Sequence, residues 1–374
     1  MIRVCHVSSV HRMERDVRIL PKECVSLAVA GYEVHLVICA GQEAAKEAAL
    51  KGVHIHRLAG VSSRFERMVK QTWRCFSLAR RIDAAIYHFH DPELIPWGML
   101  LVFMGKKVVY DVHEDVPKQI LSKAWIPAFL RSPLSSLVAA IEWLGARFFF
   151  SIVAATPSIR DRFKRINPDA IDINNFPLIG ELDSVPIDWR DKQLQVAYVG
   201  GITRIRGIQE IAKAMTLVRT GVRLQVAGTF SEPSLERQVK GEPGWKLVDE
   251  LGFVDRAGVA AVLQRAIAGL VTYHPAPNHV DAQPNKMFEY MSAGVPVIAS
   301  NFPLWLEIIE GSRCGICVDP SKPQEIAEAI DYLASHPSDG EHMGRNGQAA
   351  VKERYNWSVE EKKLLEFYRM VAAA

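Results

Sequence analysis

The stretch NHVDAQPNKMFEYMSAGVPVIAS, residues 278–300, joins a helix directly to a buried strand. Pro284 fits the first turn of a helix, because the N–H that proline lacks would be unpaired there. The helix is predicted to run to Gly294, and the apolar run VPVIAS follows at once as a buried strand. A helix joined so closely to a buried strand is typical of a parallel α/β sheet.

The same alternation of helices and strands extends through both halves of the chain. IRVCHVSS and YEVHLVICA are strand candidates on either side of a helix predicted from Glu14 to Ala30, and LQVAYVG and VRLQVAG begin the second half. A chain of 374 residues also exceeds the size at which a single core usually stops growing. We therefore predict an α/β protein with two doubly wound parallel sheets and a ligand cleft at the carboxyl ends of their strands.

The domain boundaries follow from the segment NNFPLIGELDSVPIDWR, which holds two prolines and shows no periodicity. We place a first domain at 1–177, a linker at 178–192 and a second domain at 193–355. The amphipathic segment 357–374 is predicted to be a C-terminal helix.

Charge and composition narrow the class of protein. The net charge is +3, but residues 1–180 carry +7 and residues 181–374 carry −4, so the two halves are expected to meet different partners. No run of Arg and Lys is interleaved with aromatics, which argues against nucleic acid as a partner. The six scattered cysteines and the absence of a readable signal peptide favour a cytoplasmic protein. The pair Cys314 and Cys317 is interpreted as structural rather than redox-active or zinc-binding.

Two segments leave contact with a membrane open. Residues 64–81 form a basic amphipathic pattern, and residues 125–150 are strongly apolar. Such segments either cover an ordinary α/β domain or lie on an anionic membrane surface. Peripheral contact at the inner face of the cell membrane is therefore a hypothesis beside the plain cytoplasmic location.

The helix after Pro284 offers a site for a phosphorylated ligand. Its N-terminus presents free N–H groups and the positive end of the helix dipole, and Lys286 adds a mobile cation. Glu289 lies three residues further along the same face and could accept both hydroxyls of a ribose, while Asp281 could accept hydroxyls of a sugar. The alternative is an amphipathic helix with surface charges.

This stretch resembles the Glu-x7-Glu signature of retaining glycosyltransferase family 4, in the wording of its bacterial cell-surface polysaccharide and lipopolysaccharide branch. The resemblance implies a GT-B fold, with the C-terminal helix crossing back to the first domain. It also implies that Glu289 contacts the nucleotide ribose of the donor and that Asp281, a departure from the usual Glu, contacts the donor sugar as a catalytic residue.

A second candidate site is YVGGITRIRGI, residues 198–208. Gly200 and Gly201 would let the backbone approach a ligand closely after a strand. Members of the family typically carry an Arg and, five residues later, a Lys that neutralise the donor diphosphate. Those positions are Gly201 and Arg206 here, so the resemblance makes Arg206 a catalytic and donor-binding residue, and Arg204 is expected to supply the missing charge. Fixed cations make a metal unnecessary, and no Asp-x-Asp pair offers a metal site.

The first domain is predicted to bind the acceptor. VVYDVHEDVP, residues 108–117, ends a strand with polar residues, and by resemblance His113 is catalytic and lies beside the donor sugar. His90 and Asp91 end the preceding strand, and His11 and Arg12 follow the first strand; all four are assigned to the acceptor. The alternative for His113 is a capping role, and that for His90 and Asp91 is a structural role in the cleft. His11 and Arg12 could instead contact the phosphates.

The prediction is a retaining glycosyltransferase of hexosyltransferase type. The resemblance implies a UDP-sugar as the donor, with a GDP-sugar as its main rival, and a saccharide or lipid-linked saccharide as the acceptor. A non-hydrolysing nucleotide-sugar epimerase and a nucleotide-sugar-binding scaffold without turnover are the alternatives, the latter kept open by Asp281 and Gly201. A dehydrogenase is disfavoured, because no strand–helix turn has the G-x-G-x-x-G spacing.

Overall fold

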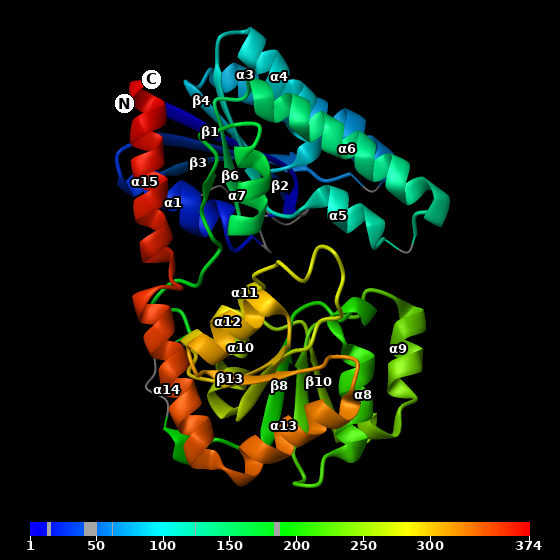
Figure 1. Ribbon diagram of the computed structural model, residues 1–374. Helices are drawn as coiled ribbons and strands as arrows, with labels where there is room; N and C mark the ends of the chain where they lie inside the picture. Colours follow the sequence, from blue (N-terminus) through cyan, green and yellow to red (C-terminus); the bar gives the residue numbers. More distant parts are fainter. Residues whose placement is uncertain (13–15, 41–50, 62, 124, 183–187) are drawn as a thin grey trace. The chain divides into compact units, whose positions relative to one another are not determined.

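The computed structural model describes residues 1–374 except 13–15, 41–50, 62, 124 and 183–187, and its chain forms two compact units (Figure 1). Unit 1 comprises Met1–Asn175 with Trp357–Ala374, and unit 2 comprises Phe176–Asn356. Each unit holds one parallel sheet with helices packed on it, which confirms the predicted α/β class with two Rossmann-like domains.

Unit 1 contains a seven-stranded sheet in the order β3-β2-β1-β4-β5-β6-β7. Its strands are β1 (Arg3–Arg12), β2 (Glu33–Ala40), β3 (Val53–Ala59), β4 (Ile86–Phe89), β5 (Lys107–Val112), β6 (Ser151–Ala154) and β7 (Ile171–Asp172). Its helical segments are η2 (Ile19–Cys24), α1 (Val25–Val29), α2 (Arg64–Glu66), η3 (Arg67–Gln71), α3 (Thr72–Ile82), η4 (Pro92–Leu94), α4 (Ile95–Phe103), α5 (Val116–Leu121), α6 (Ala128–Phe148), α7 (Pro157–Lys164) and α15 (Trp357–Ala373). The strand order reverses between β1 and β4, and such switch points are where open α/β sheets bind ligands.

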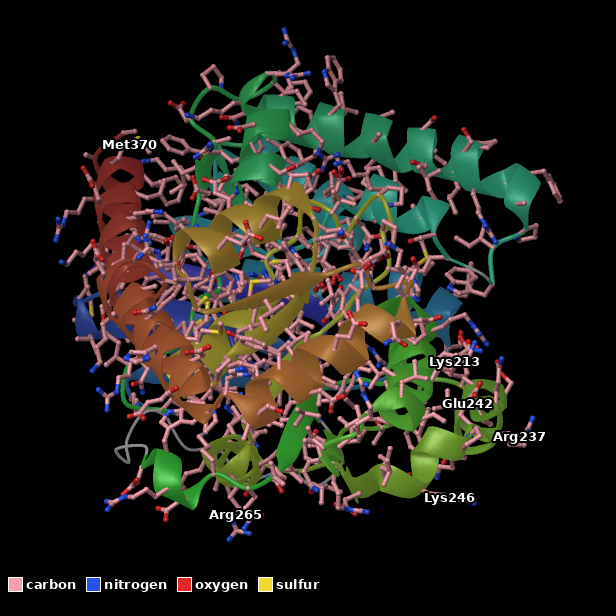
Figure 2. The ribbon with its side chains drawn as sticks, turned by 60° about the horizontal axis from the view of Figure 1, so that its bottom comes forward. Lys213, Arg237, Glu242, Lys246, Arg265 and Met370 are labelled. Carbon is pink, nitrogen blue, oxygen red and sulfur yellow. The ribbon has the colours of Figure 1, made fainter. Side chains whose placement is uncertain are left out.

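Unit 2 contains a six-stranded sheet in the order β10-β9-β8-β11-β12-β13, with its switch point between β8 and β11. Its strands are β8 (Gln195–Val199), β9 (Arg223–Ala227), β10 (Val248–Gly252), β11 (Ala268–Val271), β12 (Val297–Ser300) and β13 (Gly315–Val318). Its helical segments are η5 (Trp189–Asp191), η6 (Arg204–Arg206), α8 (Ile208–Leu217), α9 (Pro233–Lys240), η7 (Pro243–Leu247), α10 (Arg256–Arg265), α11 (Asn285–Ser292), α12 (Pro303–Gly311), α13 (Pro323–Ser335) and α14 (Pro337–Glu353). Lys213, Arg237 and Lys246, on three of these segments, point outward from the unit (Figure 2).

The sheet of unit 2 separates two apolar cores. Successive residues of a strand face opposite sides, so Val196 and Tyr198 of β8 pack in the core that includes α8 and α13. Ala197 and Val199 pack in the other core, with α11 and α12. Burial on both faces explains why the strands read as continuous apolar runs.

The sheet of unit 1 has one apolar and one partly polar face at its centre. Cys5 and Val7 of β1 pack in a core with α3, α4 and α6. His6 and Ser8, which alternate with them, point to the other side and are fully buried. Around His6, this polar side is covered by η2 and α15.

Helix α15 is fixed to unit 1 by polar contacts along its length. Trp357 Nε1 donates a hydrogen bond to Ser26 Oγ at 3.0 Å, and Glu360 Oε2 accepts one from the backbone N–H of Asn174 at 2.8 Å. Near the other end of the helix, Lys107 Nζ donates to the Val371 carbonyl at 2.9 Å. The residues after Trp357 therefore complete the unit that begins at Met1.

Two helix starts differ from the sequence-based expectation. The helix predicted from Glu14 begins at Ile19 within the described residues, because the Asp16 carboxylate accepts the backbone N–H groups of Ile19 and Leu20 at 2.8 and 2.6 Å. Pro284 lies one residue before α11 rather than in its first turn, with an extended ψ of 127°.

Candidate functional site

The loop after β8 meets the loop after β9 through two glycines. Gly200 has a φ of +111°, a backbone conformation that residues with a side chain rarely adopt. A Cβ on Gly228 would lie 1.9 Å from the Gly200 carbonyl oxygen, so the two loops touch only because position 228 has no side chain. Gly201 follows in ordinary backbone geometry and is exposed.

Arg206 returns to this glycine loop. Its Nη1 donates a hydrogen bond to the Gly201 carbonyl at 3.1 Å, and its guanidinium carbon lies 5.5 Å from the ring centre of Tyr273. Gly207 ends this short turn with a φ of +76°, and a Cβ there would lie 2.0 Å from the Thr272 carbonyl oxygen. The backbone around Arg206 is thus packed directly against the end of β11.

Lys286 is a buried cation on α11. Only 7% of the residue is exposed, and its Nζ lies 3.9 Å from the ring centre of Tyr198 and 5.0 Å from that of Tyr273. Within the described residues Nζ has no hydrogen-bond partner. Burial, and then repulsion by Arg206, hold the pKa of Lys286 well below its usual value, while Glu289 opposes them weakly. Lys286 and Arg206 therefore form a cationic pair against two aromatic rings, described below as the Lys286 site.

Glu289 is held by Arg256, a residue that no sequence pattern indicated. Arg256 Nη1 lies 2.7 Å from Glu289 Oε1, and Arg256 Nε lies 2.7 Å from Glu181 Oε1. The Glu289 side chain remains 14% exposed. Arg256 lies 33 residues before Glu289, and no motif links the two, so only the fold reveals the pair.

The other two predicted donor side chains belong to exposed residues. Arg204 is exposed, and its two terminal nitrogens donate to Gln209 at 2.6 Å and to Gln238 at 2.9 Å. Its expected role as a substitute for the missing charge stays a prediction. Asp281 is exposed in the segment between β11 and α11.

That segment also supplies residues that the sequence analysis did not single out. The His279 ring lies 5.0 Å from the Tyr273 ring, and burial together with Arg206 lowers the pKa of His279 to about 4. His274 Nε2 lies 2.9 Å from Glu210 Oε2. Tyr273 and His274 just before the 278–300 stretch, and His279 within it, were the available signal.

Asp111 is the centre of the candidate site in unit 1. It is the next-to-last residue of β5, and its carboxylate accepts two bonds from Arg18, at 3.1 and 3.0 Å. His113 Nε2 lies 3.0 Å and His90 Nδ1 lies 3.2 Å from Asp111 Oδ2. Burial alone would raise the pKa of Asp111, but Arg18 and the imidazole of His113 outweigh it and hold that pKa well below its usual value.

Asp91 and His11 lie on the neighbouring strand ends. Asp91 is buried, and its Oδ2 accepts bonds from Ser8 Oγ at 2.8 Å and from the Ser9 backbone N–H at 2.6 Å. His11 Nε2 lies 3.7 Å from Asp91 Oδ1, and the His11 ring lies 4.8 Å from the His113 ring. Burial and then His113 lower the pKa of His11.

The structure thus brings His11, His90 and His113 together, with Asp91 holding the end of β1. Their assignment to the acceptor is not tested by this geometry. Arg12 ends β1, and its side chain lies outside the described residues. Arg18 was missed because it precedes a helix rather than following a strand.

Two family models match the chain. A model described as Glycosyltransferase Family 4 matches residues 24–173, and one described as Glycosyl transferases group 1 matches residues 193–336. The first match lies in unit 1 and the second in unit 2.

Curated relatives are similar at low identity. An uncharacterized glycosyltransferase of Methanocaldococcus jannaschii is 24% identical over 261 residues, which are 64% of this chain and 65% of the relative. The match therefore spans just under two thirds of that protein. The D-rhamnosyltransferase WbpZ of Pseudomonas aeruginosa is 25% identical over 352 residues, which are 89% of this chain and 86% of the relative.

Solved structures share the fold over the whole chain. Sucrose-phosphate synthase of Thermosynechococcus elongatus superimposes with a TM-score of 0.75 at 16% identity, covering 100% of both chains. Anabaena HepE in complex with UDP-glucose superimposes with a TM-score of 0.73 at 14% identity, covering 99% of this chain and 100% of that one. Among the described residues, no helix combines the length and apolar character needed to cross a bilayer.

Proposed function

Because the chain is a glycosyltransferase family 4-like protein of GT-B fold, we propose that it transfers a sugar from a UDP-sugar to a saccharide or lipid-linked saccharide with retention of configuration. We place this reaction in the biosynthesis of a cell-surface polysaccharide. The observation that carries the proposal is the Lys286 site, where a buried cation lacks a hydrogen-bond partner among the described residues.

A nucleoside diphosphate supplies what the Lys286 site lacks. An isolated buried ammonium is costly unless an anion or a shift to the neutral form compensates it. Lys286 and Arg206 bind the diphosphate oxygens in this proposal, assisted by the N-terminal N–H groups of α11. Glu289 accepts the ribose hydroxyls, and Asp281 contacts the donor sugar. The HepE structure contains UDP-glucose on the same fold, which supports a uridine donor.

The reaction needs the leaving group to be stabilised more than it needs a nucleophile. The bond from the anomeric carbon to the diphosphate oxygen breaks, and its electron pair leaves with the diphosphate. The acceptor oxygen forms its bond on the same face of the sugar and gives its proton to a diphosphate oxygen. Lys286 and Arg206 stabilise the charge that develops on the diphosphate, and removal of one such donor typically costs about 10²–10³ in rate.

Unit 1 supplies the acceptor side in this proposal. His113 is the reacting-centre residue, and His11 and Arg12 contact the acceptor. His90 and Asp91 are buried, so they act as positioning residues: His90 through His113 and Asp91 through the end of β1. We propose that no metal is needed at the donor diphosphate.

The acceptor side also has an apolar surface suited to a membrane. Helix α6 exposes a row of large apolar side chains: Phe129, Leu130, Leu134, Leu137, Ile141, Trp143, Leu144 and Phe148. Arg131 and Arg147 lie on the same helix, which suits an anionic lipid surface. We propose that α6 binds the inner face of the cell membrane, where a lipid-linked acceptor would be held.

Proton NMR with a panel of UDP- and GDP-sugars tests the donor and the stereochemistry. Saturation transfer should report one preferred donor, bound with or without chelator. Slow release of its sugar as the initial α anomer from an α-linked donor supports retention. Glu289→Gln should weaken binding by about tenfold because a charged acceptor of hydrogen bonds is lost. Lys213→Ala, on the outward face of α8, is the matched control and should bind like wild type.

Other outcomes point elsewhere. Release of an isomerised nucleotide sugar without acceptor would replace the transferase with an epimerase. Binding without any turnover, or no binding at all, would favour a scaffold. Initial release of the β anomer from an α-linked donor would contradict retention.

A further inference from the structure

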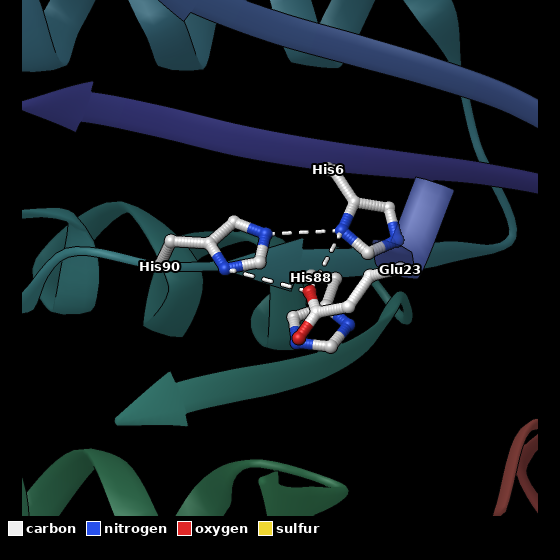
Figure 3. Close-up of side chains that lie close together, drawn as sticks. All are labelled: His6, Glu23, His88 and His90. Atoms are coloured by element: carbon white, nitrogen blue, oxygen red, sulfur yellow. Dashed lines mark hydrogen bonds and ion pairs between the residues drawn. The ribbon is translucent and has the colours of Figure 1, made fainter. Parts of the chain in front are cut away.

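Four buried side chains in unit 1 converge on one point (Figure 3). They are His6 of β1, Glu23 of η2, His88 of β4 and His90, which directly follows β4. Each is at most 2% exposed, and each offers an atom within 4.8 Å of the atoms offered by the others. We call these four residues the histidine cluster.

Two separations within the histidine cluster lie on either side of the value expected for ligands around one small ion. His6 Nδ1 lies 3.0 Å from His90 Nε2, and Glu23 Oε2 lies 3.9 Å from His6 Nδ1. Tetrahedral zinc with bonds of 2.0–2.1 Å places its ligand atoms roughly 3.3 Å apart. Three imidazoles and one carboxylate also form a donor set that divalent zinc and its neighbours prefer.

The cluster leaves polar atoms unsatisfied. Among the described residues, neither oxygen of Glu23 accepts a hydrogen bond, although Oε1 lies 2.9 Å from Arg18 Nε. His88 Nε2 likewise has no hydrogen-bond partner there. Fully buried polar atoms are normally paired, and each exception needs an explanation. A metal ion bound by these atoms would provide one.

The outer nitrogens of the rings are held as in histidines that ligate metals. Tyr368 Oη of α15 lies 2.6 Å from His88 Nδ1 and 3.3 Å from His6 Nε2. Asp111 Oδ2 lies 3.2 Å from His90 Nδ1. Such partners fix the ring orientation and tautomer of ligating histidines. Burial also lowers the pKa of His6 and His88, so both rings are neutral, which is the form that binds a metal.

We propose that His6, Glu23, His88 and His90 form a closed, structural binding site for one divalent transition-metal ion of the zinc type. Arg18 and Asp111 offset each other beside the site. The ion would join β1, β4 and η2, and through Tyr368 also α15. Its role is therefore in the stability of unit 1 and is separate from the donor diphosphate.

Metal content and cobalt spectroscopy test the site on the full chain, expressed with zinc and without a polyhistidine tag. Wild type should hold about one equivalent of zinc by mass spectrometry of the elements, and Co²⁺ should give the intense visible bands of a tetrahedral site. Prolonged chelation should lower the melting temperature of wild type. His54→Gln, at an exposed histidine of β3, controls for adventitious binding and should behave like wild type.

Two variants decide which residues are responsible. Glu23→Gln and His88→Gln should each lose the zinc and the cobalt bands, and chelator should no longer change their melting temperatures. A wild-type protein without stoichiometric zinc or cobalt bands would overturn the proposal even if neither variant folds. Retention of both signals in folded Glu23→Gln and His88→Gln would also overturn it, because the ion would then lie at other residues, such as His113 and Asp111.

Discussion

Both units bury charges near the switch point of a parallel sheet, but they satisfy those charges differently. In unit 1 the Asp111 carboxylate is met by two nitrogens of Arg18. In unit 2 the Lys286 ammonium lies over tyrosine rings, and no hydrogen bond to it is formed within the described residues. A paired buried charge specifies structure, whereas an uncompensated one is a place for a ligand of opposite sign.

The largest effect is expected when the buried ion pair of unit 1, between Arg18 and Asp111, is removed. Arg18→Met leaves the Asp111 carboxylate buried without its cation and should lower the free energy of unfolding by about 3–5 kcal/mol. Urea unfolding followed by circular dichroism measures this change. Arg160→Met, which removes a more exposed ion pair with Asp172, is the control and should cost far less. Equal losses of unfolding free energy in the two variants would mean that the buried ion pair contributes no more to stability than the more exposed one.

The next prediction concerns the uncompensated charge in unit 2, which is the Lys286 ammonium. Lys286→Met should weaken UDP binding by about a hundredfold, because the diphosphate loses a buried cation. The same change should leave the ligand-free protein at least as stable, since an apolar side chain replaces an uncompensated charge. Calorimetry with UDP measures the loss of affinity, and thermal unfolding without UDP measures the stability of the ligand-free protein. A loss of both affinity and stability would make Lys286 a structural residue instead.

The pH dependence sharpens the comparison further. Burial depresses the pKa of Lys286 in the folded protein. At pH values between the folded and the unfolded pKa, the unfolded chain therefore binds a proton that the folded protein lacks. The stability of the ligand-free protein should therefore rise with pH across that window. An anionic ligand reverses the shift, so UDP binding should take up a proton at about pH 8.5, where the phosphates are already ionised.

Calorimetric titrations in two buffers of different ionisation enthalpy measure that uptake. The observed binding enthalpy should depend on the buffer for wild type and not for Lys286→Met. A buffer dependence that persists in the variant would assign the proton to another group.

The smallest expected effect separates the two arginines of the glycine loop. Arg204 is exposed and held by Gln209 and Gln238, so Arg204→Ala should change UDP affinity by less than about fivefold. Arg206→Ala, which removes the guanidinium that contacts the Gly201 carbonyl, should cost about tenfold or more. If Arg204→Ala had the larger effect, the loop would have to rearrange on binding UDP.

The fold was predictable from the sequence because it depends on local patterns. The run VPVIAS is buried on both faces of its sheet, so its apolar character alone indicates an interior strand. The start of the first helix was not predictable in the same way. It depends on the Asp16 side chain, whose bonds to the backbone N–H groups of Ile19 and Leu20 place the helix start after residue 16.

The candidate site was predictable only in part. Lys286 and Glu289 lie within one motif, and their spacing of three residues predicted that they share a helix face. Arg18 and Arg256 lie far along the chain from the carboxylates that they meet, and nothing in their local sequence indicates a partner. His88 and His90 alternate with apolar residues in the sequence, which indicates that they share one face of a strand. Only the packing of η2 and α15 shows that this face is buried.

Helix α15 has a consequence for the order in which the protein folds during synthesis. The residues that cover His6 and His88 in unit 1 are translated after the whole of unit 2. On the ribosome, unit 2 can finish folding while the sheet translated first still has one open side. A fragment that ends at Asn175 would keep that side open, with its buried histidines and Ser26 left without Tyr368 and Trp357. The domain made first is thus the one completed last.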